Sequence, residues 1–145
     1  SFDIPIIDYV AIGVQDTVHN KSTSIMSRDE WQKTFRSLGL AQHDPLRKAS
    51  FSKKSTIFSF DELDHQDIYG KEVMRQRRLH DIENGIVIMK KNLGHNFILT
   101  LATGHKNFSP YKFFVDKHDG IYRVFEDLIS LIAPSTKNYQ LNLQQ

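Results

Sequence analysis

Seven residues in the middle of the chain have side chains that could recognise a small molecule through stacking and isolated hydrogen bonds. They comprise four aromatic residues, a carboxylate, a glycine and a threonine: Trp31, Phe35, Asp44, Phe58, Phe60, Gly85 and Thr100. Aromatic side chains supply apolar walls, and a few polar groups among such walls orient a ligand. Each residue alone has an ordinary explanation as a core residue, strand residue, helix cap or helix stop. The set predicts a binding site only if the fold brings its members together.

Catalysis has no comparable support in the sequence. The seven histidines are scattered among polar neighbours, and neither a GxSxG elbow nor a phosphate-binding glycine loop occurs. The lack of cysteine excludes a thiolate nucleophile, a thiolate zinc site and a disulfide framework. We therefore expect a protein that is not an enzyme and that uses no metal and no cofactor.

Two charged clusters are explained by one polar helix. Acidic residues and a histidine gather without the order of an HExxH or EF-hand site: Asp61, Glu62, Asp64, His65 and Asp67. A basic cluster at residues 75–78 shares its segment with Glu72, Asp81 and Glu83, which is typical of a mixed solvent face. We interpret the first cluster as a solvated helix start, and we expect no nucleic-acid contact from the second.

Length and composition are typical of one soluble domain. The 145 residues are 39% hydrophobic and 25% charged, a balance that favours a folded core over disorder. A formal net charge of +2 is too small for the electrostatic footprint of a dedicated DNA-binding domain. No apolar run approaches the ~20 residues of a membrane-spanning helix, so we expect a cytoplasmic protein without membrane contact.

The first half of the chain predicts alternating strands and helices. A β-branched and aromatic run over residues 6–14 predicts a buried strand, followed by a turn or hairpin return over 15–24. Ser27 and Glu30 form a capping-box pattern for a helix that reaches Leu38 and stops at Gly39. The Asp44-Pro45 pair begins a short helix over 45–51. A strand over 55–60 then precedes a polar helix.

The second half carries the clearest sheet signal. Asp61 or Asp64 is expected to cap the polar helix, which ends near Asn84 and Gly85. Residues 85–90 and 96–103 predict an antiparallel hairpin with its turn at 92–94. An apolar stripe from residue 110 predicts a helical stretch, interrupted at Gly120 and ended by Pro134. Together these elements predict an α/β fold: an α-β-α sandwich with a central antiparallel sheet, PAS-like or GAF-like, whose ligand lies between the sheet and one helical layer.

The order and spacing of the candidate residues resemble the signal-binding domain of LuxR-type quorum-sensing regulators. That domain carries a tryptophan on a helix, an aromatic residue one turn later, and an Asp-Pro pair that begins the next helix. Here these are Trp31, Phe35 and Asp44-Pro45, with thirteen positions from the tryptophan to the aspartate. The likeness continues through residues 53–60, 82–88 and 97–103, and so spans most of the chain from Tyr9 to Thr103.

The resemblance implies a pocket for an acyl-homoserine lactone or a related acylated signal. Trp31 would donate its indole N–H to the lactone carbonyl. Asp44 would accept the amide N–H of the ligand in a bond to a charged group, worth about 1.5–3 kcal/mol. Thr100 would reach a carbonyl of the acyl chain, directly or through water.

The remaining candidates shape the pocket, and three positions depart from the family pattern, one of them Phe60, which stands where tryptophan is common. Phe60, with Phe58 as the second choice, would pack on the lactone ring, and Gly85 would permit close approach of backbone or ligand. Phe35 stands where many members have a tyrosine whose hydroxyl binds the acyl carbonyl, and Ser27 stands where some carry another tyrosine. The implied pocket is therefore less polar than is usual in the family.

The resemblance also implies a domain organisation and partners. Residues 1–133 are expected to form the sensor domain, lacking its N-terminal helix, and 134–145 a linker or tail. A DNA-binding helix-turn-helix is expected in the full-length protein, outside this chain, together with a homodimer. Two alternatives stay open at this point: a PAS-like interaction module that binds no ligand because phenylalanines fill the pocket, and a small hydrolase acting on such signals.

Overall fold

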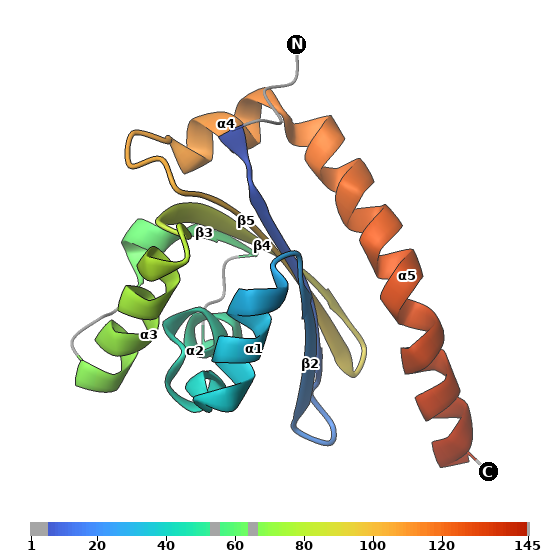
Figure 1. Ribbon diagram of the computed structural model, residues 1–145. Coiled ribbons are helices and arrows are strands. Elements are labelled where there is room, and N and C mark those ends of the chain that lie inside the picture. Colours follow the sequence, from blue (N-terminus) through green and yellow to red (C-terminus); the bar gives the residue numbers. More distant parts are fainter. Residues whose placement is uncertain (1–5, 53–55, 64–66, 145) are drawn as a thin grey trace.

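The computed structural model describes residues 6–52, 56–63 and 67–144, with side chains as far as residue 132. In this part of the chain a single antiparallel sheet has the strand order β2-β1-β5-β4-β3 (Figure 1). Its strands are β1 (Tyr9–Asp16), β2 (Lys21–Met26), β3 (Ile57–Ser59), β4 (Asn84–Asn92) and β5 (His95–Thr103). The predicted central antiparallel sheet is confirmed.

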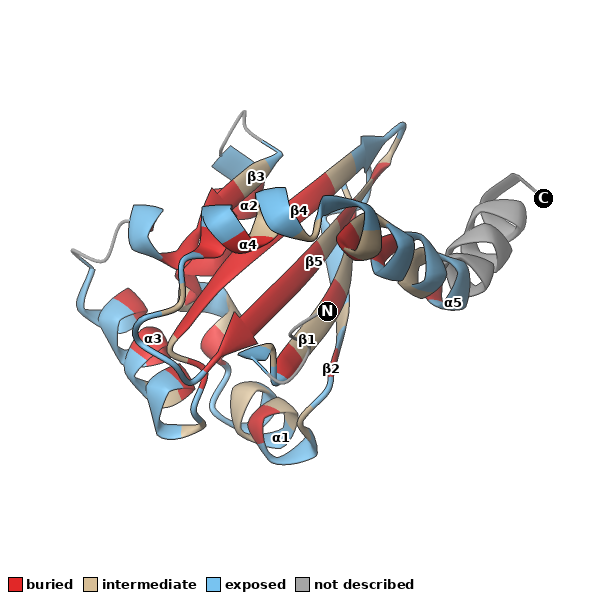
Figure 2. Cartoon of the chain, turned by 90° about the horizontal axis from the view of Figure 1, so that it is seen from above, coloured by how far each residue is buried: buried red, intermediate tan, exposed pale blue. Residues whose placement is uncertain are grey.

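Helices cover both faces of the sheet (Figures 1 and 2). On one side lie α1 (Asp29–Ser37), α2 (Pro45–Ser52) and α3 (Ile68–Leu79), with two 3-10 helices, η2 (Leu40–His43) and η3 (Phe60–Glu62). On the other lie α4 (Pro110–Asp116) and α5 (His118–Gln144). Strand side chains alternate between two cores, so Val87 packs with the first group of helices while Ile86 and Ile88 pack with the second. The α-β-α sandwich follows from this alternation.

The start of α1 differs from the predicted capping box. Arg28 is the N-cap residue and makes no side-chain capping bond. The hydroxyl of Ser27 instead accepts the backbone N–H of Val10 at 2.9 Å, and the Ser27 N–H donates to the Val10 carbonyl at 2.9 Å. Ser27 therefore extends the pairing of β1 with β2, and this long-range contact outweighs the local cap. The predicted strand at 6–14 also begins later, at Tyr9.

The polar helix is shorter than the sequence pattern predicted. It is capped by Asp67, whose carboxylate accepts the Tyr69 N–H at 2.9 Å, whereas Asp61 lies in η3 and Asp64 falls outside the described residues. The helix ends at Leu79 rather than near Asn84, because Asp81 takes a left-handed backbone conformation with a φ of 59°. Asn84 and Gly85 belong to β4.

The C-terminal helices also depart from the prediction. The break between α4 and α5 falls at Lys117, three positions before Gly120, and Gly120 lies inside α5. Pro134 does not end the helix, since α5 continues to Gln144. A proline removes one backbone hydrogen bond and favours a kink, and neither effect requires the helix to stop. None of the helices within the described residues combines the length and apolarity needed to cross a bilayer.

Candidate functional site

A cavity of about 460 Å³ lies between the sheet and the layer formed by α1, α2 and α3. Its wall is built from β1, β2, β4 and β5 on one side, and from α1, η2, α2 and α3 on the other. A volume of this size is in the range of small-molecule sites. The pocket that the fold class predicted between sheet and helices is therefore present.

Three of the predicted residues meet on the wall of this cavity. Phe35 comes from α1, Asp44 from the start of α2 and Thr100 from β5. Asp44 begins α2 as the sequence indicated, because its carboxylate accepts the Leu46 N–H at 3.1 Å. The side chains of Asp44 and Thr100 are both buried, so little of either polar group is exposed to bulk solvent.

Trp31 lies beside the cavity and is not one of the residues that line it. The indole is fully buried and packs edge-on against Phe35, with ring centroids 5.6 Å apart. Its Nε1 has no hydrogen-bond acceptor among the described residues. Burial raises the pKa of the nearby Tyr9 phenol, and the Trp31 indole lowers it by a smaller amount.

The other three predicted residues pack into the sheet beside the cavity. Phe58 and Phe60 are buried in the hydrophobic core on the same face and do not line the cavity. Gly85 pairs with Ala102 in the β4–β5 ladder, and a Cβ there would lie 3.0 Å from the Phe60 ring. Phe58 and Phe60 therefore do not fill the cavity, and it stays open although Phe35 lines its wall. An open cavity favours a ligand-binding domain over a module that binds no ligand.

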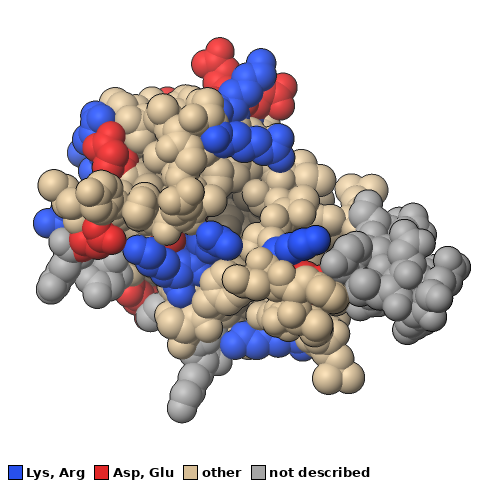
Figure 3. All heavy atoms as spheres, turned by 90° about the horizontal axis from the view of Figure 1, so that it is seen from below, with Lys and Arg blue, Asp and Glu red and all other residues tan. Residues whose placement is uncertain are grey.

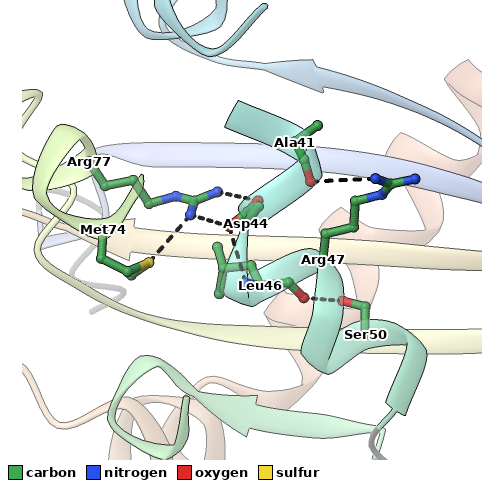
Figure 4. Close-up of polar contacts among 7 residues, drawn as sticks. All are labelled: Ala41, Asp44, Leu46, Arg47, Ser50, Met74 and Arg77. Carbon is green, nitrogen blue, oxygen red and sulfur yellow. Dashed lines mark hydrogen bonds and ion pairs between the residues drawn. The ribbon is translucent and has the colours of Figure 1, made fainter. Parts of the chain in front are cut away.

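The residue that sequence reasoning missed is Arg77. Its guanidinium reaches from α3 to Asp44 and forms a bidentate ion pair, with Nη1–Oδ1 and Nη2–Oδ2 distances of 2.5 and 2.9 Å (Figure 4). Both side chains are buried. A signal existed, because Gly70, Val73, Met74 and Arg77 follow the helical spacing of a buried stripe. The neighbouring arginines obscured it, since the cluster at 75–78 is typical of a solvent-exposed face.

The ion pair keeps Arg77 charged inside the protein. Burial alone would lower the pKa of the guanidinium, but attraction to the Asp44 carboxylate and their hydrogen bonds leave it raised above its ordinary value. The guanidinium carbon also lies 5.4 Å from the ring centroid of Trp31 and 5.8 Å from that of Phe35. Arg77 therefore forms an ion pair with Asp44 and cation–π contacts with Trp31 and Phe35 at the same time.

Several buried polar atoms at this site have no hydrogen-bond partner among the described residues. Besides the Trp31 indole, they include Oε1 of Gln15 and the Nε atoms of Arg47 and Arg77, all three from residues on the cavity wall. Buried polar groups in native proteins nearly always have a hydrogen-bond partner, so several unpaired groups at one cavity indicate that a polar ligand or water binds there. Arg36 also lines the cavity, and basic side chains surround a hollow on the face seen in Figure 3.

Tyr9 gives the site a testable response to alkaline pH. Burial raises the pKa of its phenol to about 12. The folded protein therefore holds this proton to higher pH than the unfolded chain does. Its stabilising effect is complete below about pH 10 and is lost as the pH rises toward 12, a loss of up to about 3 kcal/mol. Denaturant unfolding at stepwise pH should show a flatter decline for Tyr9→Phe than for the wild type.

Tyr111→Phe provides the comparison for this measurement. The pKa of Tyr111 is also raised to about 12, by partial burial and by its hydrogen bond to the Glu62 carboxylate, but its side chain is exposed. The loss of folding stability that Tyr111 causes between pH 10 and 12 should have the same sign as that of Tyr9 but be smaller, because solvent screens an exposed group. If the free energy of unfolding fell equally steeply with pH in the wild type and in Tyr9→Phe, the Tyr9 phenol would not be buried as the structure shows.

Comparisons with known proteins agree with this architecture. A family model described as the autoinducer binding domain matches residues 7–116. Among solved structures, the N-acylhomoserine lactone-dependent LuxR-family transcription factor CepR2 of Burkholderia cenocepacia matches with a TM-score of 0.64 and 13% identity, over 86% of this chain and 73% of that one. The VqsR ligand-binding domain of Pseudomonas aeruginosa matches with a TM-score of 0.63 and 12% identity, over 86% and 78%.

Escherichia coli SdiA extends this comparison to a longer protein. It matches with a TM-score of 0.59 and 12% identity, over 73% of this chain and 45% of SdiA, so this chain spans less than half of that protein. A second SdiA structure, in complex with octanoyl-rac-glycerol, matches with a TM-score of 0.54 and 11% identity, over 72% of this chain and 43% of that one. At these identities the structural likeness shows a shared fold. No curated protein sequence matches the chain.

Proposed function

Because its match to the family model covers most of the sequence, the chain belongs to the autoinducer-binding domain family, and we propose that it senses an acyl-homoserine lactone or a related acylated signal. In this proposal it is the sensor domain of a LuxR-type transcription regulator. The observation that carries the proposal is the cavity of about 460 Å³ whose wall combines apolar side chains with the buried Asp44 carboxylate.

Asp44 retains the capacity to bind a ligand even though it is paired with Arg77. A carboxylate has about four acceptor positions. Oδ1 accepts the Leu46 N–H and one Arg77 N–H, while Oδ2 accepts a single Arg77 N–H. As far as the described residues go, Oδ2 therefore keeps a lone pair for the amide N–H of an acylated signal. Thr100 would hydrogen-bond an acyl-chain carbonyl from the sheet side of the cavity, and Phe35 would supply an apolar wall.

Binding is expected to work by population shift. A ligand that binds only the folded protein stabilises it, by about 2.7 kcal/mol when its concentration is 100 times the dissociation constant. For a domain of this size that corresponds to a rise in melting temperature on the order of 5–10 °C. A melting-temperature screen against homoserine lactones of graded acyl length should therefore identify the preferred signal. Homoserine lactone without an acyl chain, and free fatty acids, are the matched controls.

The screen also separates the proposal that the domain senses an acylated ligand from the narrower proposal that this ligand is a lactone. A rise with other acyl amides but with no lactone would leave a sensor domain whose ligand is not a lactone. No rise with any acylated compound would favour the alternative, a PAS-like interaction module that binds no ligand. The cavity favours a sensor domain over that alternative, because Phe58 and Phe60 pack outside it and it stays open although Phe35 lines its wall.

The partners in this proposal are those the resemblance implies. We propose a cytoplasmic homodimer that contacts DNA only through a C-terminal helix-turn-helix domain of a longer protein, with no catalytic activity and no membrane contact. Sedimentation velocity with and without the lactone identified in the screen measures whether the signal favours the dimer. Among the described residues no group of three or more potential metal ligands is close enough to hold an ion.

A further inference from the structure

The Asp44–Arg77 pair presents an acceptor and donors side by side on the cavity wall. Arg77 spends three N–H hydrogens on Asp44 Oδ1, Asp44 Oδ2 and, at 3.4 Å, the Met74 sulfur. A guanidinium has five. The hydrogen on Nε and one on Nη2 therefore have no acceptor among the described residues, and Nε is buried. Next to them, Asp44 Oδ2 accepts only one hydrogen bond from the part of the chain that the structure describes.

This arrangement matches the head of an acyl-homoserine lactone. In that molecule the amide nitrogen and the ring carbonyl carbon are bonded to the same carbon atom. The amide N–H and the ring C=O can consequently point to the same side, as the N–H and C=O of one residue do in an extended peptide. A carboxylate oxygen and an adjacent guanidinium N–H are complementary to such a pair, and both contacts are charge-assisted.

Trp31 is less well placed for the ring carbonyl. It does not line the cavity, whereas Arg77 does, and the Arg77 guanidinium carbon lies over the indole ring at 5.4 Å. A ligand head that reaches Asp44 meets the guanidinium directly beside it.

We propose that Arg77, and not Trp31, donates the hydrogen bond to the ring carbonyl of the bound lactone. Arg77 is then a specificity-determining residue that selects ligands with a carbonyl adjacent to the amide-bearing carbon, while Asp44 selects the amide. This inference rests on the proposed function, because it assumes that an acyl-homoserine lactone enters the cavity.

Two matched ligands test the contact. N-octanoyl-homoserine lactone and N-octanoyl-3-aminotetrahydrofuran share the acyl chain, the amide and the five-membered ring, but the second lacks the ring carbonyl. The wild-type protein should bind the lactone roughly 10- to 100-fold more tightly, the ratio expected for one hydrogen bond to a charged group. In Arg77→Met the ratio of the two dissociation constants should fall close to one.

Control variants separate Arg77 from its neighbours. Arg78→Met removes an exposed arginine from the next position of α3 and should leave the wild-type ratio. If Arg77→Met does not fold, Asp44→Asn/Arg77→Met removes the unpaired carboxylate as well, and the ratio again should fall close to one, since both ligands keep the same amide. A ratio that persists without Arg77, or that disappears in Trp31→Phe, would overturn the inference.

Infrared spectroscopy gives a readout on the unmodified protein. With the ring carbonyl labelled with carbon-13, the difference spectrum of the bound lactone should show its stretch at lower frequency than in an apolar solvent, and Arg77→Met should reverse the shift. An unshifted band in the wild type would contradict the assignment of Arg77. If no homoserine lactone of the graded acyl series binds the wild type, the proposed lactone sensing fails and this inference fails with it. Equal affinity of the wild type for the lactone and the matched ligand without the ring carbonyl refutes only the role of Arg77.

Discussion

Asp44→Ala is expected to lower the free energy of unfolding by about 3–5 kcal/mol, because it leaves the buried Arg77 guanidinium without its counter-charge. The substitution also removes the carboxylate that caps α2 at the Leu46 N–H. Proteins of this size are stable by only about 5–15 kcal/mol, so the loss should be plain in a denaturant titration. The same variant should lose the rise in melting temperature that a lactone produces.

A double variant shows whether the ion pair causes this loss. Asp44→Ala/Arg77→Met removes both charges and puts an apolar side chain in place of the guanidinium, so much of the stability should return. Glu72→Ala breaks the exposed Glu72–Arg75 pair and should change stability very little, because solvent screens such pairs. If Asp44→Ala proved no more destabilising than Glu72→Ala, the pair would not be buried as the structure shows.

Gly85→Ala is the second substitution with a large expected effect. A Cβ at this position would lie 2.6 Å from the Leu101 carbonyl oxygen and 2.9 Å from the Ala102 Cβ. The nearest contact is with backbone, which cannot turn aside as a flexible side chain can. Strands β4 and β5 must therefore separate or twist, and we expect a loss of about 1–3 kcal/mol, measured by thermal or denaturant unfolding.

Gly13→Ala is the matched control for this strand glycine. It also lies inside the sheet, in β1, but a Cβ there meets its nearest neighbours at 3.6–4.0 Å, an ordinary contact distance. Alanine at Gly13 should leave stability unchanged or raise it slightly, since it restricts the unfolded chain. Equal losses at both positions would point to a general intolerance of side chains in the sheet and would contradict the close approach at Gly85.

The sequence predicted the sheet and the layers around it because their signals are local. The hairpin of β4 and β5 follows from two dense apolar runs around a turn that contains Gly94, and Asp44-Pro45 starts α2 where the pattern indicated. The helix ends near Ser27 and Asp81 were predicted wrongly. Ser27 is engaged by a strand seventeen positions away, and the left-handed turn at Asp81 is not visible in hydrophobic periodicity.

The candidate site was predicted in part, for a related reason. Phe35, Asp44 and Thr100 line one cavity although they come from separate elements, and the spacing that resembled a family is what pointed to them. Arg77 was missed because a charged residue in a sequence is usually predicted to be exposed. Burial of this arginine is stable only because the fold places the Asp44 carboxylate beside it, which the sequence does not show. Whether Phe58, Phe60 and Gly85 touch a ligand stays a prediction, as they pack beside the cavity.

Strand β5 carries both working surfaces of the domain on a single backbone. Ile98 and Thr100 face the cavity, while the residues between and beyond them, Leu99 and Leu101, belong to the core that also holds side chains of α4 and α5. A ligand in the cavity and the first turns of the long C-terminal helix would therefore contact opposite faces of the same strand. A change in the twist of β5 would alter the packing on both faces, because successive side chains of a strand point to opposite sides of the sheet.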